Sequence, residues 1–487
     1  MVLNTTVGES TDPKESIMPK NHIKNTKHAS VFKAARKEKS AASESISKKP
    51  TWVHLMKFTL PTMLSMLIMS TFGIVDGIFV SRLIDPIALS AVGLVFPFMG
   101  FIMAFGFMMG VGGNALVAKK IGEGREKEGR ENFSLIALVS LFVSLGLMLV
   151  GVLFPDLILN ILGVDDFARE MSLEYLRPML WFLPFAVIGM IFQQFLITAG
   201  KAHYSAIMSL VGGLISAGLN YVFIYLLDMG LSGAALATSI GFTLPFVVGL
   251  IYFTFNRSGV IYLVRPKWDY RALGRASVNG ASEMVTMLAT SITTVIMNNV
   301  LMDLEGGGMM AVAAAAIMFG GMGIFSALFV GYASGVAPII SYNYGKGDTD
   351  NLKKAYSNSL RLITILSIVS VGFAFLFGDL LIAVYDIPVG TPMHDMARTG
   401  LRFLAGGFVF MGINSFASMF FTALNNGVVS SILSLFRTLI FVVVAFLTLP
   451  VLFGLNGAWA AIPTAEIMGI VMTFIFLKLM NKKYGYA

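Results

Sequence analysis

Four charged residues fall inside long apolar stretches of this sequence: Asp76, Glu283, Arg437 and Glu466. Asp76 stands in "STFGIVDGIFVSRL", and the run from residue 58 to residue 80 contains no other charged residue. A charged group at the centre of a membrane span costs roughly 2.5–3.5 kcal/mol on insertion scales. Such a group needs a partner, a water-filled cavity or neutralisation, and it often marks an ion or substrate pathway.

The four residues receive different interpretations. Arg437 and Glu466 fall in neighbouring apolar stretches, so we interpret them as a structural ion pair or hydrogen bond between helices. Asp76 and Glu283 each stand in the first apolar stretch of one half of the chain. We interpret these two acids as functional groups on an ion or substrate pathway.

The composition identifies the class of protein that must position these residues. The chain has 487 residues, of which 56% are hydrophobic, and its mean hydropathy is +0.79. Only 13% of the residues are charged, against about 25% in soluble domains. Apolar runs of 20 or more residues recur along the chain, and the alternating ten-residue segments of a transmembrane barrel do not. The composition predicts an all-α polytopic membrane protein.

Several kinds of site are excluded by what the sequence lacks. There is no cysteine, so disulfides, iron–sulfur clusters and thiolate zinc sites are excluded. No GxxxxGK[ST] stretch indicates a nucleotide-driven pump, and no HExxH motif indicates a metalloenzyme. We expect no enzymatic activity, no nucleic-acid partner, and no cofactor or resident metal.

Hydropathy predicts twelve membrane spans, which follow a basic N-terminal tail. Residues 1–50 contain ten Lys/Arg and five Asp/Glu and lack an apolar core, so we predict a mostly disordered cytoplasmic tail. The predicted spans are 54–82, 86–118, 132–155, 169–199, 202–227, 231–256, 277–304, 307–341, 354–378, 391–424, 427–450 and 455–479.

The distribution of basic residues predicts the orientation of the spans. Most Lys/Arg fall in the tail, in the loops after spans 2, 4, 6 and 8, and at the C-terminus, as in "KKIGEGREKEGR" and "GKGDTDNLKK". The positive-inside rule then places both termini in the cytoplasm.

The sequence contains an internal repeat. "GVGGNALVAKKIGEG" (110–124) returns in outline as "ASGVAPIISYNYGKG" (333–347), and "TAGK…GLSGAA" from Thr198 returns as "TALN…GLNGAW" from Thr422. The offsets are 223 and 224. Each half holds an even number of spans, so the halves share one orientation, as in parallel transporter repeats with a site between the halves. The domains are therefore an N-lobe (51–265) and a C-lobe (266–487).

The stretches "GIVDGIFVSRLIDPIALSAVGLVFPF" and "GVGGNALVAKKIGEGREKEG" resemble the opening of the multidrug and toxic compound extrusion (MATE) family, in particular its bacterial multidrug exporters. The resemblance runs from about Trp52 to Lys478. It implies twelve helices in two six-helix lobes, and export of amphipathic organic cations by proton or sodium antiport across the bacterial inner membrane. It also implies a monomer whose partners are the lipid bilayer and small organic cations.

The resemblance also implies roles for individual residues. Asp76 matches the helix-1 acid of the family's N-lobe cation site, and Ser216, Asn220 and Thr238 match its partners on helices 5 and 6. Glu283 resembles the helix-7 glutamate of the C-lobe. Asn414 stands where the sodium-coupled branch has an aspartate on helix 10, a departure that argues against a complete sodium site in the C-lobe.

Two alternatives to a multidrug antiporter remain open. A lipid-linked oligosaccharide flippase of the same superfamily should line its cavity with several basic residues, whereas only Arg437 falls clearly within a span. A polytopic membrane enzyme should carry a recognisable catalytic set.

Overall fold

The computed structural model describes residues 46–487 except 85, 163, 165, 384 and 386, and within these residues it contains helices and no strand. The N-terminal half contains α2 (Trp52–Leu83), α3 (Pro86–Gly122), α4 (Glu126–Leu153), α5 (Pro155–Ile161), α6 (Asp166–Thr198), α7 (Ala202–Asn220), the π-helical segment η1 (Tyr221–Leu226) and α8 (Gly230–Phe255). The C-terminal half contains α9 (Tyr270–Asp303), α10 (Met309–Lys346), α11 (Thr349–Ala383), α12 (Pro392–Ala423), α13 (Gly427–Leu435), the π-helical segment η2 (Phe436–Ile440) and α14 (Phe441–Tyr484).

These helices make twelve crossings. By length and hydropathy, eleven helical stretches of the described chain are able to span a membrane, and the last of them, Gly427–Tyr484, has 58 residues. At about 1.5 Å per residue, it is more than twice as long as the ~30 Å hydrocarbon core is thick. Gly454 breaks this stretch with φ 56° and ψ −140°, so it forms two crossings. The predicted spans 427–450 and 455–479 are confirmed.

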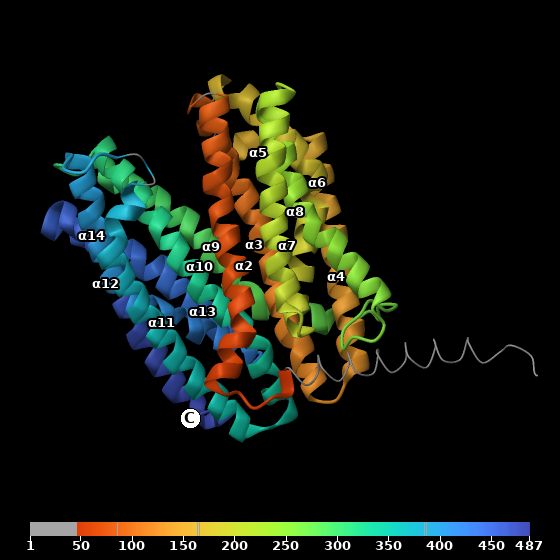
Figure 1. Ribbon diagram of the computed structural model, residues 1–487. Helices are drawn as coiled ribbons and strands as arrows, with labels where there is room; N and C mark the ends of the chain where they lie inside the picture. The colour runs from red at the N-terminus through yellow and green to blue at the C-terminus, as the bar shows by residue number, and fades with distance from the viewer. Residues whose placement is uncertain (1–45, 85, 163, 165, 384, 386) are drawn as a thin grey trace, which may run out of the picture.

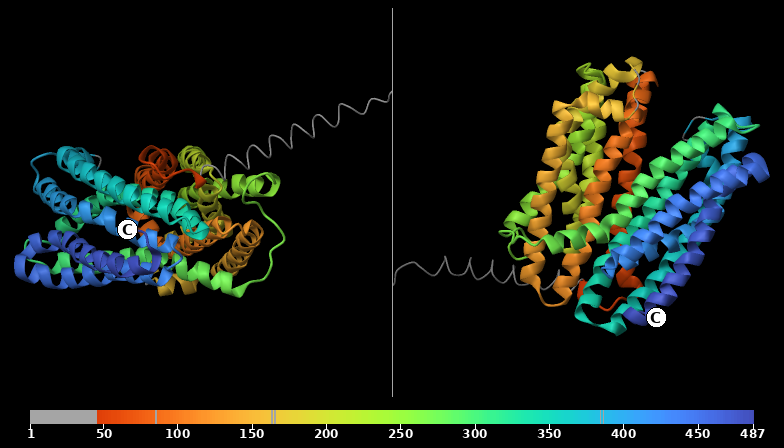
Figure 2. Two further views of the ribbon diagram at one scale, coloured as in Figure 1. Left: turned by 90° about the horizontal axis from the view of Figure 1, so that it is seen from below. Right: turned by 180° about the vertical axis from the view of Figure 1, so that it is seen from behind.

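The helices form two bundles that diverge toward the end opposite the C-terminus (Figures 1 and 2). The packing partners repeat between the bundles. In the N-lobe α3 and α8 pack against α6, and α2 packs against α7; in the C-lobe α10 and α14 pack against α12, and α9 packs against α13. The bundles join where α3 packs against α9 and α10, and where α2 packs against α10. The two-lobe fold predicted from the sequence is confirmed.

Backbone geometry repeats at the offsets seen in the sequence. Gly124 and Gly347 have φ of 76° and 72°, and Gly230 and Gly454 have φ of 54° and 56°. Glycine enters this left-handed region without the steric cost that a Cβ would impose. Equivalent turns therefore end one pair of helices, at Gly124 and Gly347, and begin another pair, at Gly230 and Gly454.

The surface between the lobes, here called the seam, depends on close helix packing. A Cβ added to Gly280 of α9 would clash with the Met108 carbonyl group of α3, and one added to Gly112 of α3 would clash with the Ala276 carbonyl oxygen. A Cβ added to Gly345 of α10 would likewise clash with the Lys119 carbonyl group of α3. Small residues allow helix backbones to approach this closely in membranes.

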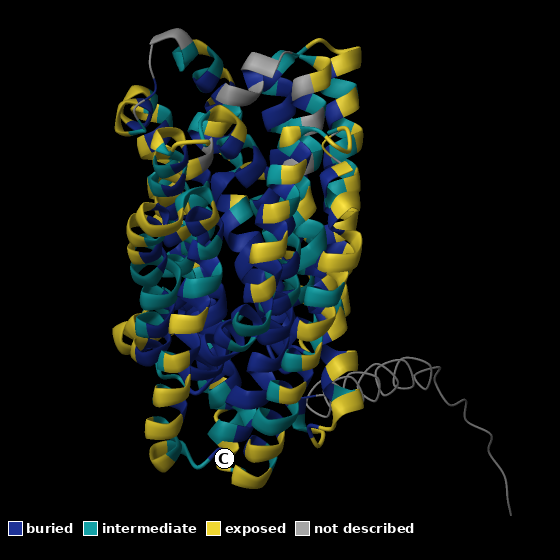
Figure 3. Ribbon diagram, turned by 90° about the vertical axis from the view of Figure 1, so that its left-hand side faces the viewer, coloured by how far each residue is buried: buried dark blue, intermediate teal, exposed yellow. Residues whose placement is uncertain are grey.

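The outer faces of the bundles are apolar and exposed. Exposed residues lie along the outer helices, whereas buried residues fill the lobe interiors (Figure 3). Val451, Leu376 and Phe255 are 83%, 78% and 77% exposed. Apolar surface on this scale marks contact with lipid.

Parts of the sequence prediction need correction. Residues 1–45 of the predicted tail lie outside the described residues, but residues 46–50 are not free: Ile46 is 2% exposed, and Asn358 of α11 donates a 2.7 Å hydrogen bond to the Pro50 carbonyl oxygen. The short helix α5 was not predicted. It begins at Pro155, whose missing N–H group suits the first turn of a helix.

Candidate functional site

The N-lobe places Asp76 of α2 against α7 and α8. The Asn220 side-chain amide donates a 2.7 Å hydrogen bond to Asp76 Oδ1, and the Ser216 hydroxyl lies 3.4 Å from the same oxygen. The Thr238 hydroxyl donates a 2.7 Å hydrogen bond to Asp76 Oδ2. Both carboxylate oxygens thus have neutral partners, and the four N-lobe residues that the sequence groups together do lie together.

Glycines allow the three helices to meet at this point. Gly213 of α7 faces the ring of Phe72 on α2, which occupies the place of a Cβ. Gly212 of α7 and Gly241 of α8 face each other, and a Cβ on either would lie 2.8 Å from the carbonyl oxygen of the other. Because a larger residue would separate the helices, these glycines bring the Ser216 and Thr238 hydroxyls within reach of Asp76.

The helix carrying the donors changes its geometry directly after the site. Ser216 and Asn220 occupy the last turn of α7, and η1 (Tyr221–Leu226) continues it as a π-helix. In the C-lobe, η2 (Phe436–Ile440) follows α13 in the equivalent helix. π-helical turns frequently occur at functional sites. The sequence showed no signal for either segment.

A cavity of about 220 Å³ opens beside Asp76, lined mainly by apolar residues of α2 and α7 such as Val75, Leu210 and Leu214. The site is uncharged apart from the acid itself. Among the described residues, no basic side chain forms a hydrogen bond or ion pair with Asp76.

The side chains around Asp76 are able to bind both its charged carboxylate and its protonated form. Asn220 Oδ1 is buried and has no partner, so it is available as an acceptor or as a ligand oxygen. Serine and threonine hydroxyls both donate and accept hydrogen bonds. The arrangement can hold a carboxylate through donated bonds, and a protonated acid or a small cation through these oxygens.

The C-lobe contains a second polar cluster, which joins α12, η2 and α14. The Asn414 amide donates a 2.7 Å hydrogen bond to Glu466 Oε2, and the Thr473 hydroxyl donates one of 2.9 Å to Asn414 Oδ1. Arg437 Nη1 lies 3.8 Å from Glu466 Oε1 and donates a 2.8 Å hydrogen bond to the Ser415 hydroxyl. The predicted contact between Arg437 and Glu466 is present.

The two C-lobe residues named by the resemblance, Glu283 and Asn414, have different partners. Asn414 lies with Glu466, whereas no hydrogen bond of Glu283 is found among the described contacts; Glu283 is half-buried on α9 and within electrostatic reach of Arg437. A cavity of about 90 Å³ lies beside this cluster, lined by Thr286, Arg437 and Glu466 among others. Glu466 therefore lies where the sequence analysis places it, in a polar contact with Arg437 between neighbouring spans.

Neither cluster has the donors of a resident transition metal. In the part of the chain that the structure describes, no group of three or more His, Cys, Asp and Glu side chains is placed to hold a metal ion.

The fold and the paired polar clusters define a two-lobe membrane transporter. The MatE family model matches residues 61–222 and 283–447, one segment in each lobe. The chain belongs to this family, whose name stands for multidrug and toxic compound extrusion.

Curated relatives and solved structures agree with this family. The chain is 25% identical to the multidrug export protein MepA of Staphylococcus aureus (strain MRSA252) over 457 residues, covering 90% of this chain and 95% of that protein. It is 24% identical to MepA of Staphylococcus haemolyticus (strain JCSC1435) over 439 residues, covering 88% of this chain and 94% of that protein.

Two solved structures share the fold. An outward-facing multidrug resistance MATE family transporter of the MOP superfamily superposes with a TM-score of 0.85 at 21% identity, covering 91% of this chain and 98% of that chain. A MATE structure in the straight conformation gives a TM-score of 0.84 at 22% identity, covering 91% and 99%.

Proposed function

We propose that this protein is an antiporter that exports amphipathic organic cations across the cytoplasmic membrane, driven by entry of protons or sodium ions. Membership of the MatE family and the similarity to MepA, a multidrug export protein, support transport of drugs rather than enzymatic catalysis. The basic loops at the end that holds the C-terminus support a cytoplasmic location for both termini.

The observation that carries the proposal is the environment of Asp76. Its carboxyl group lies beside a 220 Å³ cavity and is held by three neutral side chains. A structural acid within a membrane is expected to have a basic partner, as Glu466 has in Arg437. An acid without one is free to exchange a proton or sodium ion during the cycle.

Alternating access supplies the coupling. The inward-moving cation and the outward-moving drug stabilise different orientations of the two lobes, so each turnover links their movements. Exchange of one inward cation for one outward monovalent organic cation moves no net charge, so the concentration gradient of the coupling ion drives it. A ten-fold ion gradient is worth about 1.4 kcal/mol and sustains a drug gradient of roughly ten-fold.

The test is transport by reconstituted protein. Wild type, Asp76→Asn and Asp228→Asn are placed in vesicles, and ethidium movement is measured under an imposed pH gradient and then a sodium gradient. Asp228 is a matched control because it is exposed in the same lobe and has φ 50°, which asparagine tolerates well.

We expect one of the two gradients to drive transport by wild type and by Asp228→Asn. Asp76→Asn should transport ethidium at least ten-fold more slowly than wild type under that gradient. It should still bind ethidium, because asparagine retains the shape of the side chain without the charge. Wild-type coupled transport by Asp76→Asn would overturn the assignment of Asp76. Absence of transport by wild type under both gradients would overturn the antiport mechanism.

A further inference from the structure

A polar cavity of about 320 Å³ lies in the seam at the end of the molecule that holds the C-terminus. Four cationic side chains line it: Lys119 and Lys120 from the last turns of α3, Arg125 from the following turn, and Arg275 from the first turns of α9. This cavity is separate from the clusters around Asp76 and Glu466, which lie within the lobes. Neither cluster accounts for its charge.

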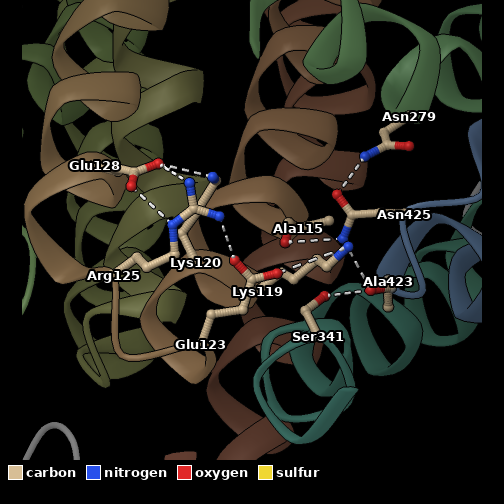
Figure 4. Close-up of polar contacts among 10 residues, drawn as sticks. All are labelled: Ala115, Lys119, Lys120, Glu123, Arg125, Glu128, Asn279, Ser341, Ala423 and Asn425. Carbon is tan, nitrogen blue, oxygen red and sulfur yellow. Dashed lines mark hydrogen bonds and ion pairs between the residues drawn. The ribbon is translucent and has the colours of Figure 1, made fainter. Parts of the chain in front are cut away.

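The carboxylates nearby neutralise only part of this charge. Glu123 lies 3.1 Å from Arg125 and 3.9 Å from Lys119, and Glu128 accepts a 2.9 Å hydrogen bond from Lys120 and also pairs with Arg125 (Figure 4). Arg275 makes no ion pair with any described carboxylate. Four cations face two acids, which leaves an excess of two positive charges.

Amide side chains hold the walls of the cavity together. Asn279 of α9 donates a 2.8 Å hydrogen bond to Asn425 Oδ1, and Asn425 Nδ2 donates one of 3.3 Å to the Ala115 carbonyl oxygen of α3 (Figure 4). Asn425, which follows α12, therefore ties the C-lobe to the N-lobe at the cavity. The basic groups of the two lobes therefore line one space.

We propose that this cavity binds a phosphate group, carried either by the headgroup of an anionic phospholipid or by a small soluble phosphate. Inorganic phosphate or a phosphate monoester carries up to two negative charges near neutral pH, which matches the excess, and the phosphodiester of a phospholipid headgroup carries one, which neutralises half of it. Arginine binds phosphate through paired N–H groups and lysine binds it as a point charge. The volume is at the lower end of the range of about 300–1,000 Å³ for ligand pockets.

The position of the cavity suits either source. Basic pockets between membrane helices on the cytoplasmic side bind acidic lipid headgroups, and both Lys120 and Arg275 lie near helix ends. Because the cations come from both lobes, a bound phosphate bridges the seam. It therefore stabilises the arrangement in which the seam is closed, since a ligand favours the state that it binds better.

The test is direct binding to the full-length protein, purified in detergent and stripped of lipid. Inorganic phosphate is titrated at constant ionic strength against chloride, and short-chain phosphatidylglycerol is titrated against phosphatidylcholine, with heat of binding and thermal stability as readouts. The variants are Arg275→Gln and Lys119→Gln. Arg271→Gln is the matched control, because Arg271 is exposed one turn earlier on α9 and does not line the cavity.

We expect saturable binding of at least one probe to wild type and Arg271→Gln, weakened ten-fold or more in Arg275→Gln and Lys119→Gln. Binding of phosphatidylglycerol alone assigns the site to a lipid headgroup, and binding of inorganic phosphate assigns it to soluble phosphates. Absence of saturable binding by wild type, or equal weakening in Arg271→Gln, overturns the proposal. No ion gradient or drug is present, so failure of the antiport proposal does not affect this result.

Discussion

Each oxygen of the Asp76 carboxyl group has its own hydrogen-bond partners, so substitution of one partner should affect one oxygen. Thr238 is the only described hydrogen-bond partner of Oδ2, whereas Asn220 and Ser216 share Oδ1. Thr238→Val keeps the shape of the side chain and removes the hydroxyl. Leaving a charged group without one hydrogen bond costs roughly 1.5–3 kcal/mol.

We expect Thr238→Val to lower gradient-driven efflux about ten-fold or more, and Thr238→Ser to restore most of it. Initial rates in proteoliposomes at matched protein content provide the measurement. If valine and serine at this position transport equally well, the hydroxyl of Thr238 has no part in coupling.

The pair in the C-lobe should behave as a structural unit. Arg437 and Glu466 are only 11% and 8% exposed, and removing one partner of a buried pair leaves the other uncompensated, at a cost of about 3–5 kcal/mol. Arg437→Met and Glu466→Gln should each lower the unfolding temperature strongly, and the double variant should be more stable than their sum predicts.

A double-mutant cycle on thermal unfolding in detergent measures this coupling. Additive effects of the two substitutions would show that the 3.8 Å contact contributes no stability. Glu283 would then be the better candidate for the partner of Arg437, since it is also within electrostatic reach of that side chain.

At this scale the sequence identified Asp76 and its partners but not the partners of Asn414. Asp76, Ser216, Asn220 and Thr238 could be grouped because the resemblance to the family specifies which helices meet. For Asn414 the resemblance specified only a position on helix 10, whereas in the structure its amide bonds to Glu466, 52 positions further along the chain. Contacts between α12 and α14 depend on how the helices rotate about their axes, which hydropathy does not specify.

At the scale of helices, glycine positions decide which surfaces meet. Gly280 of α9 packs directly on the backbone of α3 at Met108, so Gly280→Ala places a methyl group where the carbonyl group lies. Overpacking of this kind costs typically about 1–3 kcal/mol. We expect this variant to be less stable and to lose most efflux, because the seam cannot close.

Gly274→Ala is the control for that prediction. It lies on the same helix with no atom within 4 Å of an added Cβ, and alanine favours helix over glycine by up to about 1 kcal/mol. Equal stability and efflux of the two variants, measured by thermal unfolding and vesicle transport, would contradict the role assigned to the seam.

The sequence predicted the number of crossings and the repeat because both follow from composition and spacing. Hydropathy predicts the spans. The offsets of 223 and 224 found in the sequence also relate the turns of the structure, since they connect Gly124 with Gly347 and Gly230 with Gly454. The π-helical segments could not be predicted, since they depend on how η1 and η2 pack against neighbouring helices. The seam could not be predicted either, because it joins helices from separate halves of the chain.

For the whole molecule, the packing pattern predicts a movement of rigid lobes. Each lobe has its own interior, and the lobes meet chiefly through α2 and α3 of one and α9 and α10 of the other. Rigid-body rotation about such an interface is a common form of switching. Opening of the seam at one end should therefore accompany approach of the lobes at the other.

The chain contains no cysteine, so pairs of spin labels can be introduced without background. The distance between labels at Lys127 and Lys353 measures separation of the lobes at the end that holds the C-terminus. The distance between labels at Leu227 and Val389 measures it at the opposite end, where the bundles diverge. All four side chains are exposed. When the organic cation and the coupling ion are added in turn, one of these two interlobe distances should lengthen whenever the other shortens. Leu149 with Leu227, both in the N-lobe, should stay constant. A change within this control pair, or two interlobe distances that vary independently, would show that the lobes do not move as rigid bodies.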